Sequence, residues 1–312
     1  MGHPSLSLDA SKEILSILLA CPVVQFRGEW FEMSSTQTNG RRPVRFGCRF
    51  SVFRMSVVVA AVCVCAALRL LSSDAAQIDL PRNALWEVVH NICVPGQSLY
   101  QDPKPCVQVD LKDGFAILRD PRKKTQFLLI PTSQISGIES PTVRAPNAPN
   151  YFADAWESRI YLDEGLHQTL PRDDVGLAIN SAVSRTQDQF HIHFSCVRPD
   201  VLEALHSNET RIGEQWAPFT APYLMRHYMA IWVSGEDLGA NNPFNLLAET
   251  LPGAVQDMAS RTLVVIGFTR ADGTKGFVIL AGHASKSSGD LANGEELLDP
   301  ACHIAEVRNK SH

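Results

Sequence analysis

The chain has 312 residues, of which 45% are hydrophobic and 20% charged, and a formal net charge of −5. This is the composition of a globular protein, and it excludes a collagen-like, coiled-coil or disordered chain. The acidic balance gives no basic footprint, so we expect no nucleic acid partner. Eight cysteines are too few for a disulfide-dense small domain, but their distribution along the chain is informative.

The most biased part of the chain is an apolar segment near residue 60. Residues 56–68 (SVVVAAVCVCAAL) carry no charge, residues 41–54 contain five arginines and no acid, and residues 72–76 are small or polar. These are the parts of a signal peptide or signal anchor, and we predict one at residues 55–76. The alternative is a buried helix, which leaves the one-sided arginine cluster without a role.

The apolar segment divides the chain into three parts. Residues 1–54 have mixed composition and no clear periodicity, and we treat them as an uncertain N-terminal extension. Arginines before the segment predict that residues 77–312 are exported as one domain. The first 76 residues hold 8 of the 28 Lys and Arg and 5 of the 33 Asp and Glu. The exported part therefore keeps 20 basic and 28 acidic residues, a net charge of −8.

Four cysteines lie in the exported part, and an oxidising compartment predicts that they form two disulfides. Cys93 and Cys106 flank a loop rich in Pro and Gly (VPGQSLYQDPKP), so we expect them to pair. Cys196 is then left to pair with Cys302. The alternative is four unpaired buried thiols, which a cytoplasmic orientation would require.

Residues 77–312 show several short apolar runs separated by turn signals. Strand pairs with helices between them, and no regular βαβ repeat, predict an α+β fold with a mainly antiparallel sheet and flanking helices. We expect strands at 114–118, 126–130, 175–180, 190–197, 263–268 and 276–280, and helices at 84–92, 151–167, 199–207 and 244–258.

The most informative strand is the one predicted at residues 190–197. His191 and His193 are two residues apart, so both should emerge on one face, together with Gln189 and Ser195. Phe190, Ile192, Phe194 and Cys196 alternate with them on the other face. Such a polar row predicts a surface that is used, either as a metal-binding pair, as a nucleophile with its orienting neighbour, or as two solvent-facing histidines.

The segment from Asn180 to Ser195 resembles the histidine-triad superfamily. In that superfamily an Asn that ends one strand precedes a strand with alternating histidines, and the second histidine attacks a nucleotide α-phosphorus. Counting without gaps from Asn180 makes His193 the nucleophile and His191 the first triad position, with Ser195 at the third. Gln187 then falls on the phosphate-contacting Gln of the superfamily, and Arg185 is a further candidate phosphate contact. A second register, Gln189-x-His191-x-His193, makes His191 the nucleophile but loses the Asn spacing.

A closer resemblance extends from about residue 85 to residue 302. In order, the chain shows CVP at 93–95, LLIPT at 128–132, GIESP at 137–141, PNYF at 149–152, LAINS at 177–181 and HIHFSCVRPD at 191–200. These motifs and all four exported cysteines resemble the bacterial CDP-diacylglycerol pyrophosphatase family. One position departs from the pattern, because Gln189 stands where the enterobacterial form has a histidine.

The resemblance implies a histidine-triad-like fold and a hydrolase that cleaves CDP-diacylglycerol to CMP and phosphatidate. It implies a nucleotidyl-histidine intermediate and no cofactor or metal, since neutral imidazole is both a nucleophile and a leaving group at neutral pH. Two alternatives stay open: a metal-dependent nucleotide pyrophosphatase that uses His191 and His193 as ligands, and a non-catalytic CDP-lipid binding protein.

The same resemblance implies a location. With the apolar segment at 55–76 as an anchor, we expect a single-pass protein of the bacterial inner membrane whose catalytic domain lies on the periplasmic side. The partner it implies is CDP-diacylglycerol in the membrane, and the sequence leaves the oligomeric state open.

Overall fold

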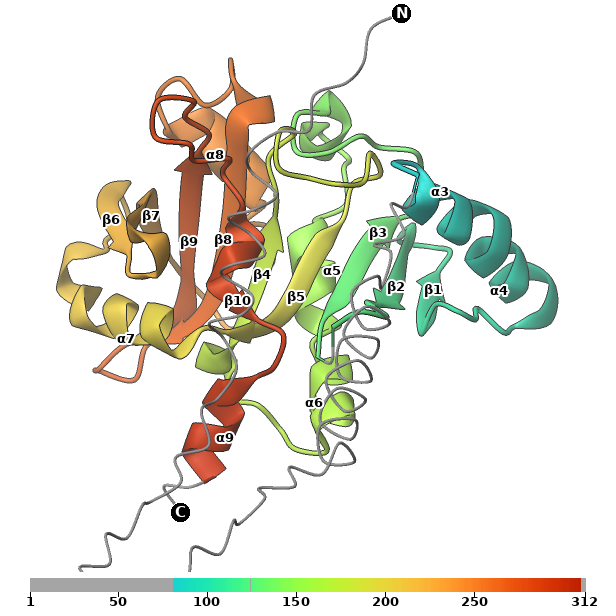
Figure 1. Ribbon diagram of the computed structural model, residues 1–312, viewed down its shortest axis with the longest axis horizontal. Helices are drawn as coiled ribbons and strands as arrows, with labels where there is room; N and C mark the ends of the chain where they lie inside the picture. Colours follow the sequence, from blue (N-terminus) through green and yellow to red (C-terminus); the bar gives the residue numbers. More distant parts are fainter. Residues whose placement is uncertain (1–80, 124, 310–312) are drawn as a thin grey trace, which may run out of the picture. The chain divides into compact units, whose positions relative to one another are not determined.

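The computed structural model describes residues 81–123 and 125–309 (Figure 1). The predicted extension at 1–54 and the predicted signal segment at 55–76 lie outside these residues. In the described part, no helix combines the length and the apolar character needed to cross a bilayer.

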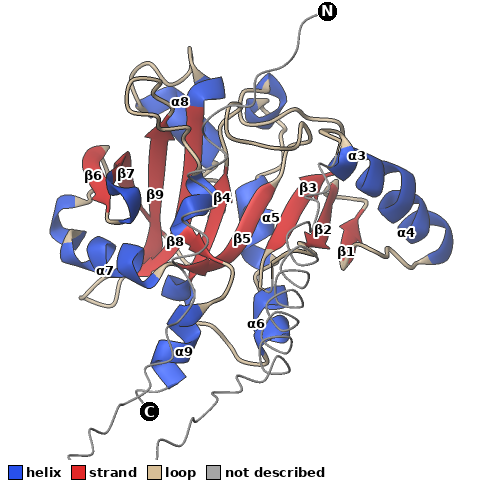
Figure 2. Ribbon diagram, in the orientation of Figure 1, coloured by secondary structure: helices blue, strands red, loops and turns tan. Residues whose placement is uncertain are grey.

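Within the described residues, ten strands form one antiparallel sheet (Figure 2). Nine of them follow the order β1-β2-β3-β5-β4-β8-β9-β7-β6, and β10 pairs with the end of β5. The strands are β1 (Gln108–Asp110), β2 (Phe115–Arg119), β3 (Phe127–Pro131), β4 (Val175–Ile179), β5 (Ile192–Val197), β6 (Ala217–Ala221), β7 (Arg226–Ser234), β8 (Arg261–Thr269), β9 (Lys275–His283) and β10 (Leu298–Asp299).

Helices flank the sheet, which confirms the α+β class and the mainly antiparallel pairing. They are α3 (Ala84–Val88), α4 (Val94–Tyr100), α5 (Tyr151–Glu157), α6 (Ile160–Leu166), α7 (Pro199–Ser207), α8 (Pro243–Thr250) and α9 (His303–Asn309), with the π-helical turn η1 (Val89–Cys93) and the 3-10 turn η7 (Gly294–Leu297). The predicted hairpins form as β2–β3 and β8–β9, and the predicted strands at 175–180 and 190–197 pair as β4 and β5.

Both predicted disulfides are present, Cys93–Cys106 and Cys196–Cys302. The segment after Cys93 is not the predicted loop, however, because α3, η1 and α4 follow one another as far as Tyr100. Pro95 has no N–H for an α-helical hydrogen bond, and the chain widens into the π-helical turn just before it. The helical segment therefore continues through Pro95 and beyond its predicted end at residue 92.

Other boundaries also differ from the sequence prediction. The predicted helix at 244–258 ends at Thr250, since Pro252 cannot continue the hydrogen-bond ladder. The predicted helix at 151–167 is two helices, α5 and α6, separated at residues 158–159. Strand β6 contains Pro218 and was not predicted, and its place at the edge of the sheet explains why a proline is accepted there.

The two faces of the sheet are covered by different elements. His193 pairs with Leu128 on β3 and with Ala178 on β4, and cross-strand partners point to the same side. We call this side the histidine face. The helix formed by α3 and η1 covers part of it, since Val89 and Cys93 pack with Leu128. On the opposite face α5 packs across β3, β5 and β4 with a large aromatic core (Figure 1).

Candidate active site

The polar row of Gln189, His191, His193 and Ser195 is buried, which corrects the expectation of an open surface. His191 and His193 are 7% and 6% exposed, and Gln189 and Ser195 are almost fully covered. Strand β5 begins at Ile192, so His191 is the last residue before the strand. The two imidazole rings nevertheless lie side by side, with their centroids 4.8 Å apart and their planes nearly perpendicular. The histidine pair is therefore a buried cluster covered by other parts of the chain.

The hydrogen bond between His193 and Gln126 assigns the tautomer of His193. The side-chain nitrogen of Gln126 lies 2.7 Å from Nδ1 of His193 and 3.0 Å from Oε1 of Glu295. A carboxylate only accepts, so the contact with Glu295 requires the NH2 group of Gln126 at this position. That group donates to Nδ1 of His193, which leaves the ring proton on Nε2, 3.3 Å from Oε2 of Glu295. Nε2 of His193 consequently has no free lone pair in this arrangement.

The hydrogen bond of His191 assigns the opposite tautomer. Nδ1 of His191 lies 2.7 Å from the backbone carbonyl oxygen of Gln189, two residues earlier. A carbonyl only accepts, so Nδ1 carries the proton and the lone pair lies on Nε2. A neutral imidazole with its lone pair on Nε2, held by a fixed backbone oxygen, is the form in which histidine acts as a nucleophile.

Burial keeps both histidines in the neutral form. Desolvation lowers the pKa of His191 below its ordinary value, and the nearby cation of Arg185 adds to this effect. Desolvation also holds the pKa of His193 well below its ordinary value, with further lowering by His191 and Lys123. Neutral imidazole is therefore present at pH 7 at both positions, and the tautomer is what separates them.

Asn180 lies closer to His191 than to His193 across the β4–β5 pair. Ala178 pairs with His193, and continuing this antiparallel register by two residues brings Asn180 level with His191. Asn180 and His191 also line the same small cavity. The amide of Asn180 contacts Glu295 twice: Nδ2 donates to Oε2 at 3.3 Å, and Oδ1 accepts from the backbone N–H at 3.2 Å. Asn180 thereby fixes the segment that covers the site.

Arg185 faces the same small cavity, as expected for a phosphate contact. Its Nη1 lies 2.7 Å from Oε2 of Glu139, and its side chain is 11% exposed. Gly137 lies directly beneath the guanidinium, and any Cβ at that position would collide with it. Desolvation by itself would raise the pKa of Glu139, but the hydrogen bond and charge of Arg185, with smaller hydrogen bonds from the backbone and Ser136, together lower it. A charged, positioned guanidinium therefore lies beside His191.

Gln187 and Ser195 have partners that bind them to the fold. The side-chain oxygen of Gln187 accepts from the N–H of Leu85 at 3.0 Å, and its nitrogen donates to the carbonyl of Pro81. The hydroxyl of Ser195 donates to the carbonyls of Thr125 and Asp299. Gln187 thus holds the start of α3, and Ser195 joins β5 to two neighbouring segments. The structure does not bring either side chain into the cavity beside His191.

Gln189 also has a supporting position. Its amide nitrogen donates to the carbonyls of Pro131 and Ser133, and its oxygen accepts from the N–H of Ile135 at 3.3 Å. An amide can both donate and accept, and Gln189 uses both functions to hold the loop after β3. The glutamine at this position therefore makes hydrogen bonds that fix the loop after β3.

Three residues of the site were not predicted: Gln126, Glu295 and Lys123. Glu295 contacts His193, Asn180 and Gln126, and the ammonium group of Lys123 pairs with its carboxylate. Glu295 lies on η7, far from His193 in sequence, and its segment NGEEL has no motif. Lys123 follows Arg122 in a hairpin turn, a pattern typical of solvated charge. Only the spatial arrangement identifies these residues.

In the part of the chain that the structure describes, no group of three or more His, Cys, Asp or Glu residues is arranged to hold a metal ion. At the histidine pair, two potential ligands from different segments, His193 and Glu295, lie 3.3 Å apart.

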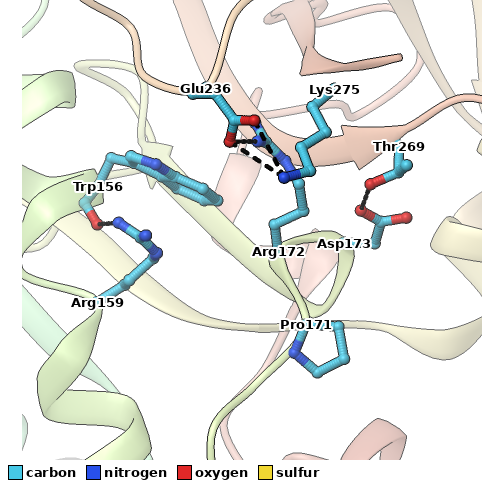
Figure 3. Close-up of a pocket in the computed structure, with 8 residues that line it drawn as sticks. All are labelled: Trp156, Arg159, Pro171, Arg172, Asp173, Glu236, Thr269 and Lys275. Atoms are coloured by element: carbon cyan, nitrogen blue, oxygen red, sulfur yellow. Dashed lines mark hydrogen bonds and ion pairs between the residues drawn. The ribbon is translucent and has the colours of Figure 1, made fainter. Parts of the chain in front are cut away.

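A second cavity of about 400 Å³ lies on the opposite face of the sheet (Figure 3). The indole of Trp156 lines it and packs over Gly267. The preceding residue, Ile266, points to the histidine face, so Gly267 faces the opposite side of the sheet. Its cations are paired: Lys275 lies 3.0 Å and Arg172 3.5 Å from carboxylate oxygens of Glu236 (Figure 3). Three cations and two acids line this cavity, and the sheet separates it from the histidines.

Comparison with known proteins assigns the chain to a family. The family model described as CDP-diacylglycerol pyrophosphatase matches residues 80–306. The chain is also 39% identical over 222 residues to the CDP-diacylglycerol pyrophosphatase of Yersinia pestis, a stretch that covers 71% of this chain and 84% of that protein. Together with the buried histidine pair, these matches show that the chain belongs to the CDP-diacylglycerol pyrophosphatase family and is a hydrolase.

Proposed function

We propose that this protein hydrolyses the pyrophosphate bond of CDP-diacylglycerol to CMP and phosphatidate, with His191 as the nucleophile. The observation that carries the assignment is the contact between Nδ1 of His191 and the carbonyl of Gln189. It puts the lone pair on Nε2 of His191, whereas Gln126 and Glu295 leave Nε2 of His193 protonated. The register of Asn180 supports the same choice, which replaces the preference for His193 that sequence spacing alone favoured.

The reaction proceeds in two balanced steps. In the first, Nε2 of His191 bonds to the α-phosphorus, the bond from that phosphorus to the bridging oxygen breaks, and phosphatidate leaves with the bridging oxygen and its electrons. In the second, water attacks the same phosphorus and the nitrogen–phosphorus bond breaks. CMP departs with the oxygen and one proton of water, the other proton passes to solvent, and the imidazole returns to its neutral form. The leaving phosphatidate is a weak base, so this pathway needs no strong acid.

Arg185 is the group best placed to stabilise charge in these steps. It lies beside His191 in the small cavity and is already oriented by Glu139. A fixed guanidinium stabilises the charge that develops on non-bridging phosphate oxygens without having to reorganise. His193, packed edge to face on His191, restricts the ring of the nucleophile. We propose Arg185 as a phosphate-binding residue and His193 as a positioning residue.

We also propose a histidine-triad-like core and a membrane anchor. The pair β4 and β5 brings Asn180 level with His191 across two antiparallel strands, which supports the first proposal. The apolar segment at 55–76 and the lipid substrate named for the family support the second. On this proposal the protein is a single-pass protein of the bacterial inner membrane with its catalytic domain in the periplasm, where both disulfides would form.

Trapping the covalent intermediate tests the function and the nucleophile together. Purified protein is mixed with CDP-diacylglycerol labelled at the α-phosphate and quenched in alkali during the first turnover. Wild-type protein and His193→Ala should retain label on the chain, and His191→Ala should retain none. Label on His191→Ala but not on His193→Ala would restore His193 as the nucleophile. Absence of CMP release from wild-type protein would contradict the proposed function.

A further inference from the structure

A second open pocket adjoins the histidine site on the same side of the sheet. It has a volume of about 640 Å³ and lies between helix α3, the disulfide-closed segment before Cys106, and the turn from β2 to β3. Val88, Pro105 and Leu118 contribute aliphatic carbon to its lining, and Arg119, Arg122 and Lys123 contribute cations. Asp120 is the single acid among its lining residues, so the pocket is both apolar and positively charged.

Lys123 connects this pocket to the histidines. It lines the pocket, its ammonium group pairs with Glu295, and Glu295 lies 3.3 Å from Nε2 of His193. The small cavity with Asn180 and Arg185 lies on the other side of the pair, next to His191. The site is thus flanked by two cationic regions of different character: an enclosed polar one by Arg185, and an open, partly aliphatic one by Lys123.

We propose that the open pocket binds the phosphatidyl part of the substrate, with Arg122 and Lys123 on the phosphate that leaves. This inference rests on the proposed function, because it assigns the two flanking regions to the two ends of one pyrophosphate. The ligand class is a phosphomonoester bearing a glycerol and acyl chains, for which a cationic group and aliphatic carbon are required side by side.

Two observations favour a lipid over a nucleoside in this pocket. None of the residues that line it is aromatic, whereas nucleobases are commonly bound by stacking on aromatic rings. Exposed apolar side chains also continue beyond it, with Ile92 one turn after Val88 and Val107 two residues after Pro105.

Direct binding tests the pocket without requiring turnover. Dihexanoyl phosphatidate, glycerol 3-phosphate, inorganic phosphate and CMP are titrated by calorimetry into wild-type protein, Arg122→Gln and Lys112→Gln. Arg122 is 72% exposed at the pocket, and Lys112 is an exposed cation of the β1–β2 turn outside it, which makes Lys112→Gln the matched control. Thermal unfolding of each variant verifies that the fold is intact.

We expect Arg122→Gln to weaken phosphatidate binding about tenfold, as the loss of one charge-assisted contact predicts, and to leave CMP binding unchanged. Lys112→Gln should bind both ligands as the wild type does. The wild type should bind dihexanoyl phosphatidate more tightly than glycerol 3-phosphate or inorganic phosphate, because the acyl carbons contact the aliphatic lining.

Three results would overturn the proposal: weakened CMP binding in Arg122→Gln, no change in phosphatidate binding, or equal affinity of the wild type for phosphatidate and inorganic phosphate. Each of these three results is a binding measurement and does not require cleavage of the substrate. If the wild type binds phosphatidate at Arg122 but releases no CMP from CDP-diacylglycerol, the proposed function fails and the pocket assignment stands. If CMP is released normally but Arg122→Gln binds phosphatidate as before, the pocket assignment alone fails.

Discussion

His191 and His193 differ more in their surroundings than in their position. Both are buried, both face the same side, and their rings touch. His191 is held by the backbone of its own chain segment, through the carbonyl of Gln189. His193 is held by the side chain of Gln126, from a distant segment, and its Nε2 lies 3.3 Å from Glu295 without a hydrogen bond. The comparison shows that hydrogen-bond partners, and not residue type or exposure, decide which imidazole has a lone pair to give.

The largest expected effect comes from removing each histidine in turn. His191→Ala should lower kcat/KM for CMP release at least about ten-thousandfold, because a nucleophile has no substitute in a two-step mechanism. His193→Ala should lower it about ten- to a hundredfold, since it removes only support for the neighbouring ring. The measurement is steady-state hydrolysis of CDP-diacylglycerol. Equal losses in the two variants would remove the distinction between them.

A smaller effect is expected from the carboxylate that holds His193. Glu295→Gln removes the negative charge that pairs with Lys123 and leaves one acceptor oxygen where the carboxylate has two, so we expect kcat to fall about tenfold. Nitrogen NMR of labelled histidines should show protonation at Nδ1 of His191 in both proteins, and a change at His193 alone in the variant. The neighbouring Glu296, which pairs with Arg226, provides the control variant Glu296→Gln, and its kcat should stay within about twofold. A change at His191 in Glu295→Gln would contradict the separate anchoring of the two rings.

The smallest effect is expected from pH between 6 and 8. The nucleophile must be neutral, and burial lowers the pKa of His191, so the neutral form persists below pH 6.5. Activity should therefore be flat through pH 6.5 and fall on the acid side, by about tenfold per unit once the pH is below the lowered pKa. His193→Gln should keep this acid limb, because the limb belongs to His191. A fall in kcat/KM that begins above pH 6.5 would contradict a buried neutral nucleophile.

The sequence was sufficient for features that depend on local pattern. The alternation in residues 190–197 predicted β5 and its shared face, and cysteine positions predicted both disulfides. It was not sufficient for the register of β4 against β5. Spacing along the chain from Asn180 to His193 includes the turn, and the conformation of that turn decides which residues come level. Continued by two residues, the register of β4 and β5 brings Asn180 level with His191.

The remaining site residues could not have been predicted because they arrive from far along the chain. Gln126 and Glu295 are 169 residues apart in sequence, and they meet because β3, which follows Gln126, and β10, which follows η7, both pair with β5. Burial of the polar row was missed for the same reason, since alternation indicates which side chains share a face but not what covers that face. Gln187, predicted as a phosphate contact, instead holds the N-terminus of α3.

The Cys196–Cys302 disulfide has a consequence for the timing of synthesis. It joins β5, which carries His193, to the residue three positions after β10, and Glu295 lies just before β10 on the same segment. A ribosome that has completed both histidines must still add more than a hundred residues before Glu295 and Cys302 exist. The contacts that Glu295 makes with Gln126 and Asn180 can therefore form only after residues near the end of the described chain have been made.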